Sequence, residues 1–211
     1  MESLLRLSRL IDFLNEKVGR SVLWLSLVAV LISSVNALVR KFFNYSSNGF
    51  LEIQWYLFAA MFLLCSGYTL MRNEHVRIDV FLHRFSKPTQ IKVDIFGLLV
   101  FLLPAATLII SLSWPLFIKA LGSGEMSENA GGLVRWPVYL LVPVGFALLW
   151  VQGISELIKR VAFLKGLIDD PTKRSQDKTA EEELAELIRA EAEQAEAAQA
   201  AAAQASQGDR K

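Results

Sequence analysis

The side chains best suited to chemistry gather in one short segment, residues 72–79. His75 and Asp79 stand four residues apart and would share one face of a helix, which suggests a metal pair or an acid–base pair. Two ligands are fewer than a zinc site needs, and the second histidine, His83, has no companion at ligand spacing. We therefore expect no catalytic, metal or cofactor site here, but a short connection whose arginines meet anionic lipid.

Four long apolar blocks must position this segment. The 211 residues are 53% hydrophobic and 20% charged, whereas soluble domains are about 45–50% apolar and about 25% charged. A helix needs about 20 apolar residues to cross the roughly 30 Å of bilayer hydrocarbon. The blocks predict spans at about residues 22–39, 50–71, 95–118 and 136–158. The sequence therefore predicts an all-α integral membrane protein with four transmembrane helices.

The positively charged residues alternate from one side of the predicted spans to the other. Twelve Lys and Arg residues fall before the first span, between the second and third, and soon after the fourth, against four in the other two connections. Cytoplasmic loops carry an excess of positive charge. This distribution predicts that both termini and the middle connection lie in the cytoplasm.

Two further segments flank the transmembrane domain, which we place at residues 21–168. In residues 1–20 apolar side chains recur every three or four positions and charged ones fill the other face. This pattern predicts an amphipathic helix on the membrane surface or against a partner, with a solvated helix as the alternative. Residues 169–211 are rich in Ala, Glu and Gln, which favours a partly disordered, helical cytoplasmic tail.

The middle of each predicted span carries no charged residue. An ionisable side chain inside the membrane usually marks an ion or substrate path, because its burial is costly. A chain that moved a polar solute alone would need such a site near the midplane. Pro104 and Pro143 interrupt the third and fourth spans without a charged companion, so they predict kinks.

Weaker candidates for contacts lie on the first span, at the start of the second span and in the outer loop. Small residues at a spacing of four on the first span favour close helix packing, within the chain or against another subunit. Glu52 and Gln54 begin the second span, where they face a partner or, as we favour, the lipid headgroups. The Gly-rich outer loop predicts turns, with docking of an external partner as the alternative. The candidate contacts to a partner subunit are Glu52, Trp55, Ala29, Ser33 and Ala37, and those to an external protein are Glu125, Glu128, Asn129 and Arg135.

Three of these segments, in this order, resemble one known family: the small membrane subunit of tripartite ATP-independent periplasmic (TRAP) transporters. Residues 73–80 resemble its Asn-x-His-Val-Arg-x-Asp signature. Residues 52–55 resemble the start of its second helix, and residues 127–137 resemble the outer loop of members for mannitol, chloroaromatic or other carboxylate uptake. The resemblance covers roughly residues 10–165 and leaves the tail outside. The signature residues are Asn73, His75, Val76, Arg77 and Asp79.

The resemblance implies an accessory subunit in the bacterial inner membrane. In that family a large multi-span subunit carries substrate and sodium, a soluble periplasmic binding protein delivers small organic acids, and the small subunit acts as a scaffold. Membrane lipid is then a further partner, and no cofactor or nucleic acid is expected. The residues themselves leave open an assembly subunit of an unrelated complex, or a membrane-bound enzyme with a cytoplasmic site at Glu74, His75, Asp79 and His83.

Overall fold

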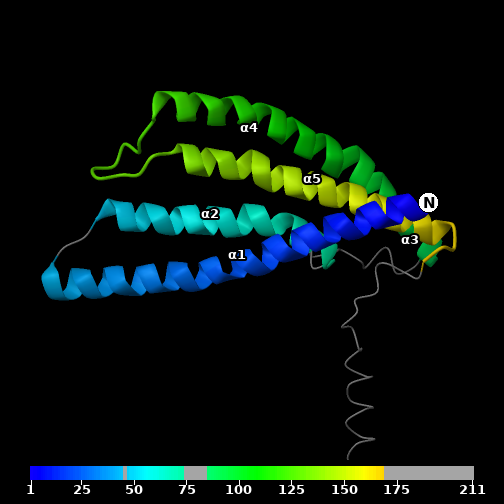
Figure 1. Ribbon diagram of the computed structural model, residues 1–211, viewed down its shortest axis with the longest axis horizontal. Coiled ribbons are helices and arrows are strands. Elements are labelled where there is room, and N and C mark those ends of the chain that lie inside the picture. Colours follow the sequence, from blue (N-terminus) through cyan, green and yellow to red (C-terminus); the bar gives the residue numbers. More distant parts are fainter. Residues whose placement is uncertain (45–46, 74–84, 169–211) are drawn as a thin grey trace, which may run out of the picture. The chain divides into compact units, whose positions relative to one another are not determined.

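The computed structural model describes residues 1–44, 47–73 and 85–168, and every regular element in this part is a helix (Figure 1). Four of its helices are long and apolar enough to cross a membrane, which confirms the predicted all-α class and the four spans. The predicted tail and the connection at residues 74–84 lie outside the described residues. In chain order the elements are α1 (Glu2–Phe43), α2 (Asn48–Met71), α3 (Lys87–Gly97), a π-helical turn η2 (Leu98–Leu102), α4 (Leu103–Ser123) and α5 (Trp136–Leu164).

Helix α1 joins the amphipathic segment to the first span without a break. It contains 42 residues, and at 1.5 Å per residue it is about 63 Å long, roughly twice the hydrocarbon thickness. Its first half therefore extends beyond the span. There the residues packed on the rest of the chain include Ser8, Ile11 and Asn15, whereas Leu7, Leu10 and Leu14 remain exposed. The leucines of the amphipathic stripe thus face away from the bundle.

The four long elements form an open row. Helix α1 packs on α2, α2 on α5, and α5 on α4, and the first half of α1 also crosses the end of α5 (Figure 1). Glycine allows the close approach of α5 to α2: a Cβ on Gly145 would lie 2.7 Å from the carbonyl oxygen of Leu63. At most 28% of the most apolar window of any span is buried within the chain. The outward faces must therefore meet lipid or another protein.

The third span contains a π-helical turn directly before Pro104. The N–H of Leu103 bonds to the carbonyl of Leu98, five residues back rather than four. Proline has no N–H and its ring crowds the preceding turn, so a wider turn accommodates it. Before Pro104 the structure thus has a π turn, and Gly153 of α5 packs closely against Leu102 and Leu103.

Candidate functional site

Only the first residue of the signature segment lies in the described part of the chain. Asn73 has a left-handed φ of 58°, and its N–H donates to the carbonyl of Leu70 at 3.1 Å, which ends α2. Asparagine tolerates this conformation better than most residues. The other signature residues, His75, Val76, Arg77 and Asp79, fall outside the described residues.

The turn that precedes the signature is tied to α1. Arg72 donates to Glu16 at 3.2 Å, and its guanidinium lies over the ring of Tyr68 at 5.3 Å. Glu16 also pairs with Arg20 one turn later on α1. The start of the connection therefore has a fixed position relative to the first half of α1.

Glu52, near the start of α2, holds the loop between α4 and α5. Its carboxylate accepts hydrogen bonds from the Ser127 hydroxyl, from the Asn129 amide at 2.8 Å and from the Leu133 N–H at 2.7 Å. We call Glu52, Ser127, Asn129 and Leu133 the Glu52 clasp. Glu52 therefore has partners inside the chain that the expectation of headgroup contact did not include.

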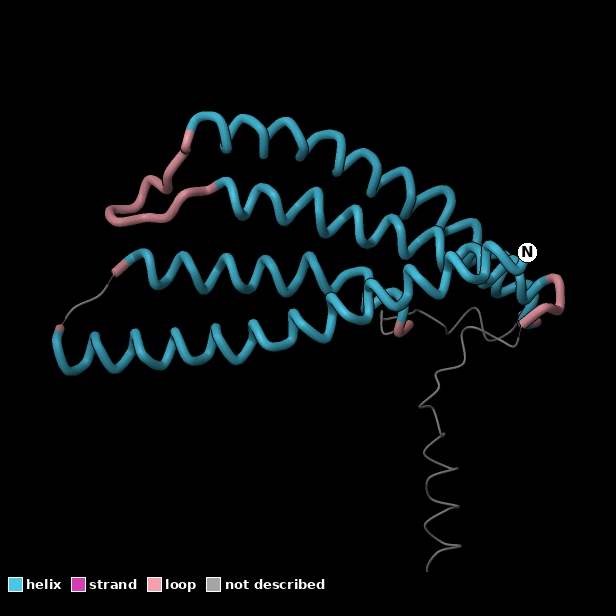
Figure 2. Tube along the Cα trace, in the orientation of Figure 1, coloured by secondary structure: helices cyan, strands magenta, loops and turns pink. Residues whose placement is uncertain are grey.

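The clasped loop is a small hairpin (Figure 2). Met126 and Val134 form an isolated antiparallel bridge, and Gly131 supplies a left-handed φ of 72° at the turn. Two side chains of α2 add support, because Asn48 donates to the Ala130 carbonyl at 3.1 Å and Tyr56 to the Val134 carbonyl at 3.0 Å. The loop is thus an ordered surface fixed to α2.

The four residues considered for docking have different positions in this hairpin. Arg135 pairs with Glu125 at 3.1 Å, and this hydrogen bond raises the pKa of Arg135 above its usual value. Asn129 belongs to the Glu52 clasp. Glu128 is exposed. Among the four, Glu128 is thus the group best placed to meet another molecule.

The other candidate contacts to a partner subunit differ in their exposure. Trp55 is 76% exposed and borders a cavity of about 290 Å³ beside the Glu52 clasp. Ala29 is buried, whereas Ser33 and Ala37 are exposed. The stripe of small residues therefore packs within the chain at its first member and is open at the other two.

A second polar group lies at the opposite end of the row, where the first half of α1 crosses α5. Asp12 accepts hydrogen bonds from Gln152 and from Ser155, both at 2.8 Å, and pairs with Lys159 at 3.1 Å. Asn15 donates to Gln152 at 3.0 Å. The set, which we call the α1–α5 polar cluster, consists of Ser8, Asp12, Asn15, Asp94, Gln152, Ser155, Glu156, Lys159 and Arg160.

Two charges of this cluster, Glu156 and Arg160, are buried, and its ion pairs join three helices. Arg160 of α5, only 3% exposed in its side chain, pairs with Glu156 and with Asp94 of α3, the latter at 3.2 Å. Glu156 also pairs with Lys159. Buried charges are tolerated only when they are paired and hydrogen-bonded. The cluster therefore fixes the first half of α1 and the start of the third span on α5.

The sequence carries a signal for this cluster in the spacing of its polar residues. The polar residues of α5 recur at positions 152, 155, 156, 159 and 160, and those of α1 at 8, 12 and 15. Each set has helical spacing and would form a stripe. The cations after the fourth span were instead interpreted as a topology signal, and the charged residues of positions 1–20 as the polar face of an amphipathic helix.

Neither polar group is arranged as a metal site. In residues 1–44, 47–73 and 85–168, no three His, Cys, Asp or Glu side chains lie together as metal ligands would. Both groups instead join helices to one another or to a loop.

Comparison with known proteins assigns the family. The family model of the DctQ component of tripartite ATP-independent periplasmic transporters matches residues 29–163. The chain belongs to this family. It is therefore a small permease subunit of a TRAP transporter, a multi-pass protein of the bacterial inner membrane, and not an enzyme.

A relative of known function supports the same assignment. The C4-dicarboxylate TRAP transporter small permease protein DctQ of Pseudomonas aeruginosa is 31% identical over 108 residues, which is 50% of either chain. The matched part of this DctQ-family chain thus spans about half the length of that relative. No solved structure matches the chain.

Proposed function

We propose that this DctQ-family chain scaffolds the large transport subunit of a sodium-dependent TRAP transporter that imports small organic acids. The observation that carries the proposal is the open row of helices. Helices α1 and α4 stand at its two edges, each packed on the row from one side. Many of their exposed residues are large and apolar, among them Leu31, Leu38, Leu108 and Leu112. Such a row suits a subunit that adds a static wall to a larger membrane protein.

The distribution of polar groups supports a role beside the transport path rather than in it. The buried ionic groups of the described residues belong to the α1–α5 polar cluster, at one end of the row. Their partners come from within the chain. The substrate class and the coupling ion follow the family resemblance and the printed function of the Pseudomonas aeruginosa relative.

The orientation we propose places both termini in the cytoplasm, since the positive residues are concentrated at that end. The hairpin held by the Glu52 clasp then faces the periplasm. Its ordered backbone and the exposed Glu128 support a part in docking the periplasmic binding protein.

Recovery of the complex tests the scaffold role. The tagged full chain is purified from its native membrane in mild detergent, alongside a variant with Leu7→Ser, Leu10→Ser and Leu14→Ser. These leucines are exposed at 45%, 65% and 48%, so their replacement leaves the packed face of α1 unchanged. We expect the parent chain to recover a large multi-span protein at about one to one, and the variant to recover clearly less, because burial of apolar side chains drives association outside the bilayer core.

The matched control is Arg9→Ser, an exposed change in the same half of α1. It should recover the partner as the parent does. A parent chain that emerges stable and alone would refute the scaffold role. Equal recovery by the leucine variant would remove the first half of α1 from the contact surface.

A further inference from the structure

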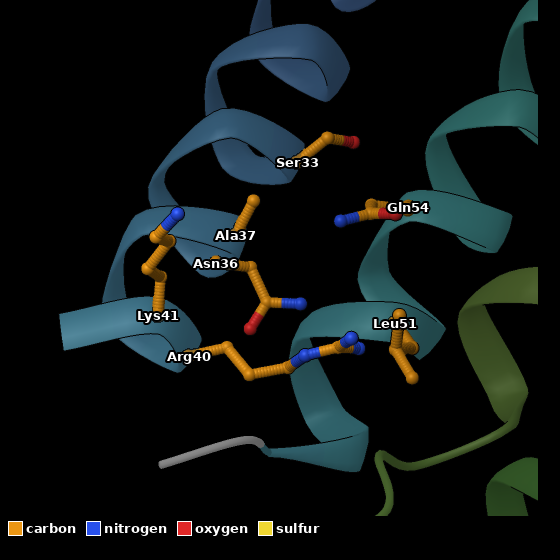
Figure 3. A pocket seen from close by; sticks show the side chains of 7 residues that line it. All are labelled: Ser33, Asn36, Ala37, Arg40, Lys41, Leu51 and Gln54. Atoms are coloured by element: carbon orange, nitrogen blue, oxygen red, sulfur yellow. The ribbon is translucent and has the colours of Figure 1, made fainter. Parts of the chain in front are cut away.

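A cavity of about 530 Å³ separates the end of α1 from the start of α2 (Figure 3). Its volume lies within the range of about 300–1,000 Å³ that is common for small-ligand pockets. The stripe of small residues makes it wide, because Ser33 and Ala37 leave space that larger side chains would fill. The polar and small residues that line it are Ser33, Asn36, Ala37, Arg40, Lys41 and Gln54.

The cavity is positively charged. Arg40 and Lys41 line it and no carboxylate does, and within residues 1–44, 47–73 and 85–168 neither cation has an ion-pair partner. The nearby carboxylate of Glu52 is bound to the hairpin instead. An anion in the cavity would therefore meet two uncompensated positive charges.

The amide groups provide a second, independent indication of a ligand. The Oδ1 atom of Asn36 is buried and accepts no hydrogen bond from the residues that the structure describes. Buried polar atoms without a partner are rare and costly. Figure 3 shows the amide nitrogens of Asn36 and Gln54 directed into the space between the two helices, the Asn36 oxygen turned toward Arg40, and the Arg40 side chain extended toward α2. The cavity thus offers two cations and two amide N–H donors, a combination that suits an acid group.

We propose that this cavity binds the headgroup of an anionic glycerophospholipid, with phosphatidylglycerol as the representative ligand. The phosphodiester would meet Arg40 and Lys41, and the amide N–H groups of Asn36 and Gln54 would donate to its oxygens. The position suits a lipid, because Arg40 and Lys41 form the last turn of the span, at the depth where headgroups lie. The inference concerns the isolated chain and does not depend on the proposed scaffold role.

Basic residues in a final helical turn also complement the helix dipole. That explanation accounts for the charges of Arg40 and Lys41. It accounts neither for the volume between the helices nor for the two amide nitrogens directed into it, and a bound headgroup explains all three.

Binding to the full chain provides the test. The chain is purified in mild detergent, freed of lipid, and titrated separately with short-chain phosphatidylglycerol, phosphatidylcholine and glycerol 1-phosphate, followed by native mass spectrometry and thermal unfolding. We expect one tight phosphatidylglycerol per chain and a raised unfolding temperature. Phosphatidylcholine should bind more weakly, because its headgroup adds a cation. Glycerol 1-phosphate should bind weakly, because it lacks acyl chains.

Variants locate the site. Arg40→Gln with Lys41→Gln should weaken phosphatidylglycerol binding by about tenfold or more, since charge-assisted hydrogen bonds are lost. Ala37→Leu keeps the charges but fills the cavity, and should weaken binding by a similar factor. Lys119→Gln removes an exposed cation from α4, which ends at the same end of the row, and should leave binding unchanged.

Several results would overturn the proposal. Equal loss in Lys119→Gln would mean general electrostatic attraction, and unchanged binding in Ala37→Leu would place the lipid elsewhere. Equally tight glycerol 1-phosphate would identify a site for a free anion. An absence of phosphatidylglycerol binding to the parent chain would leave the cavity to a side chain of another subunit.

Discussion

A glutamate organises the contacts at each end of the row of helices in this DctQ-family chain. The two glutamates have different kinds of partner. Glu156, 4% exposed, pairs with Lys159 and Arg160 inside the α1–α5 polar cluster. Glu52 is only half-buried and accepts hydrogen bonds from neutral donors of a single loop. At one end charges join three helices, and at the other a carboxylate orders a hairpin.

The difference shows how burial decides what a polar contact contributes. At the buried Glu156 and Arg160, a lost partner leaves a charge with little access to water, so the remaining group carries its desolvation cost. At the clasp, water can replace a lost donor. We therefore expect changes in the cluster to affect the stability of the whole bundle, and changes in the clasp to affect the hairpin alone.

The largest effect is expected from Arg160→Met. The change removes the cation that Glu156 and Asp94 share and leaves Glu156 with Lys159 alone. Breaking a buried pair from one side costs about 3–5 kcal/mol. We expect the free energy of unfolding, measured by denaturant titration in mixed micelles, to fall by about that amount. The control is Arg9→Met, an exposed arginine of α1 for which little change is expected. Similar losses in the two variants would contradict the distinction between cluster and surface.

A smaller effect is expected where the cluster packs against α2. A Cβ on Gly67 would overlap the Oδ1 atom of Asn15, which is itself buried and has no donor among the described residues. Overpacking of this kind costs about 1–3 kcal/mol. Gly67→Ala should therefore lower the free energy of unfolding, measured as above.

Gly97→Ala is the matched control, because a Cβ at Gly97 meets nothing within 4 Å. That change should stabilise the helix slightly or leave it unchanged. Combined with Asn15→Ala, the Gly67→Ala change should cost less than the sum of the two single losses. Strictly additive losses would show that the two side chains do not compete for the same space.

Much of this fold could be predicted from hydropathy alone, because a long run of apolar residues identifies a transmembrane helix without any knowledge of its tertiary contacts. The four spans were predicted for this reason. The pairing of polar faces could not be predicted, because Asp12 and Ser155 are separated by 143 residues and Glu52 and Leu133 by 81. A stripe of polar residues indicates that a helix has a partner but not which helix it is. The leucines of α1 dominated the sequence pattern, and the polar face beside them is the one that packs on α5.

The smallest effect is expected at the clasp, from Glu52→Gln. The carboxylate of Glu52 accepts hydrogen bonds at both oxygens, whereas the new amide has an NH₂ group in place of one of them. That NH₂ group would face a group that is itself a donor, such as the N–H of Leu133. We expect thermolysin to cleave the hairpin severalfold faster, while the unfolding of the helices changes little because the hairpin lies outside their packed faces. Glu128→Gln removes the same charge from an exposed residue of the same loop and should leave the cleavage rate unchanged. Equal acceleration in both variants would mean that loop charge, rather than the Glu52 clasp, orders the hairpin.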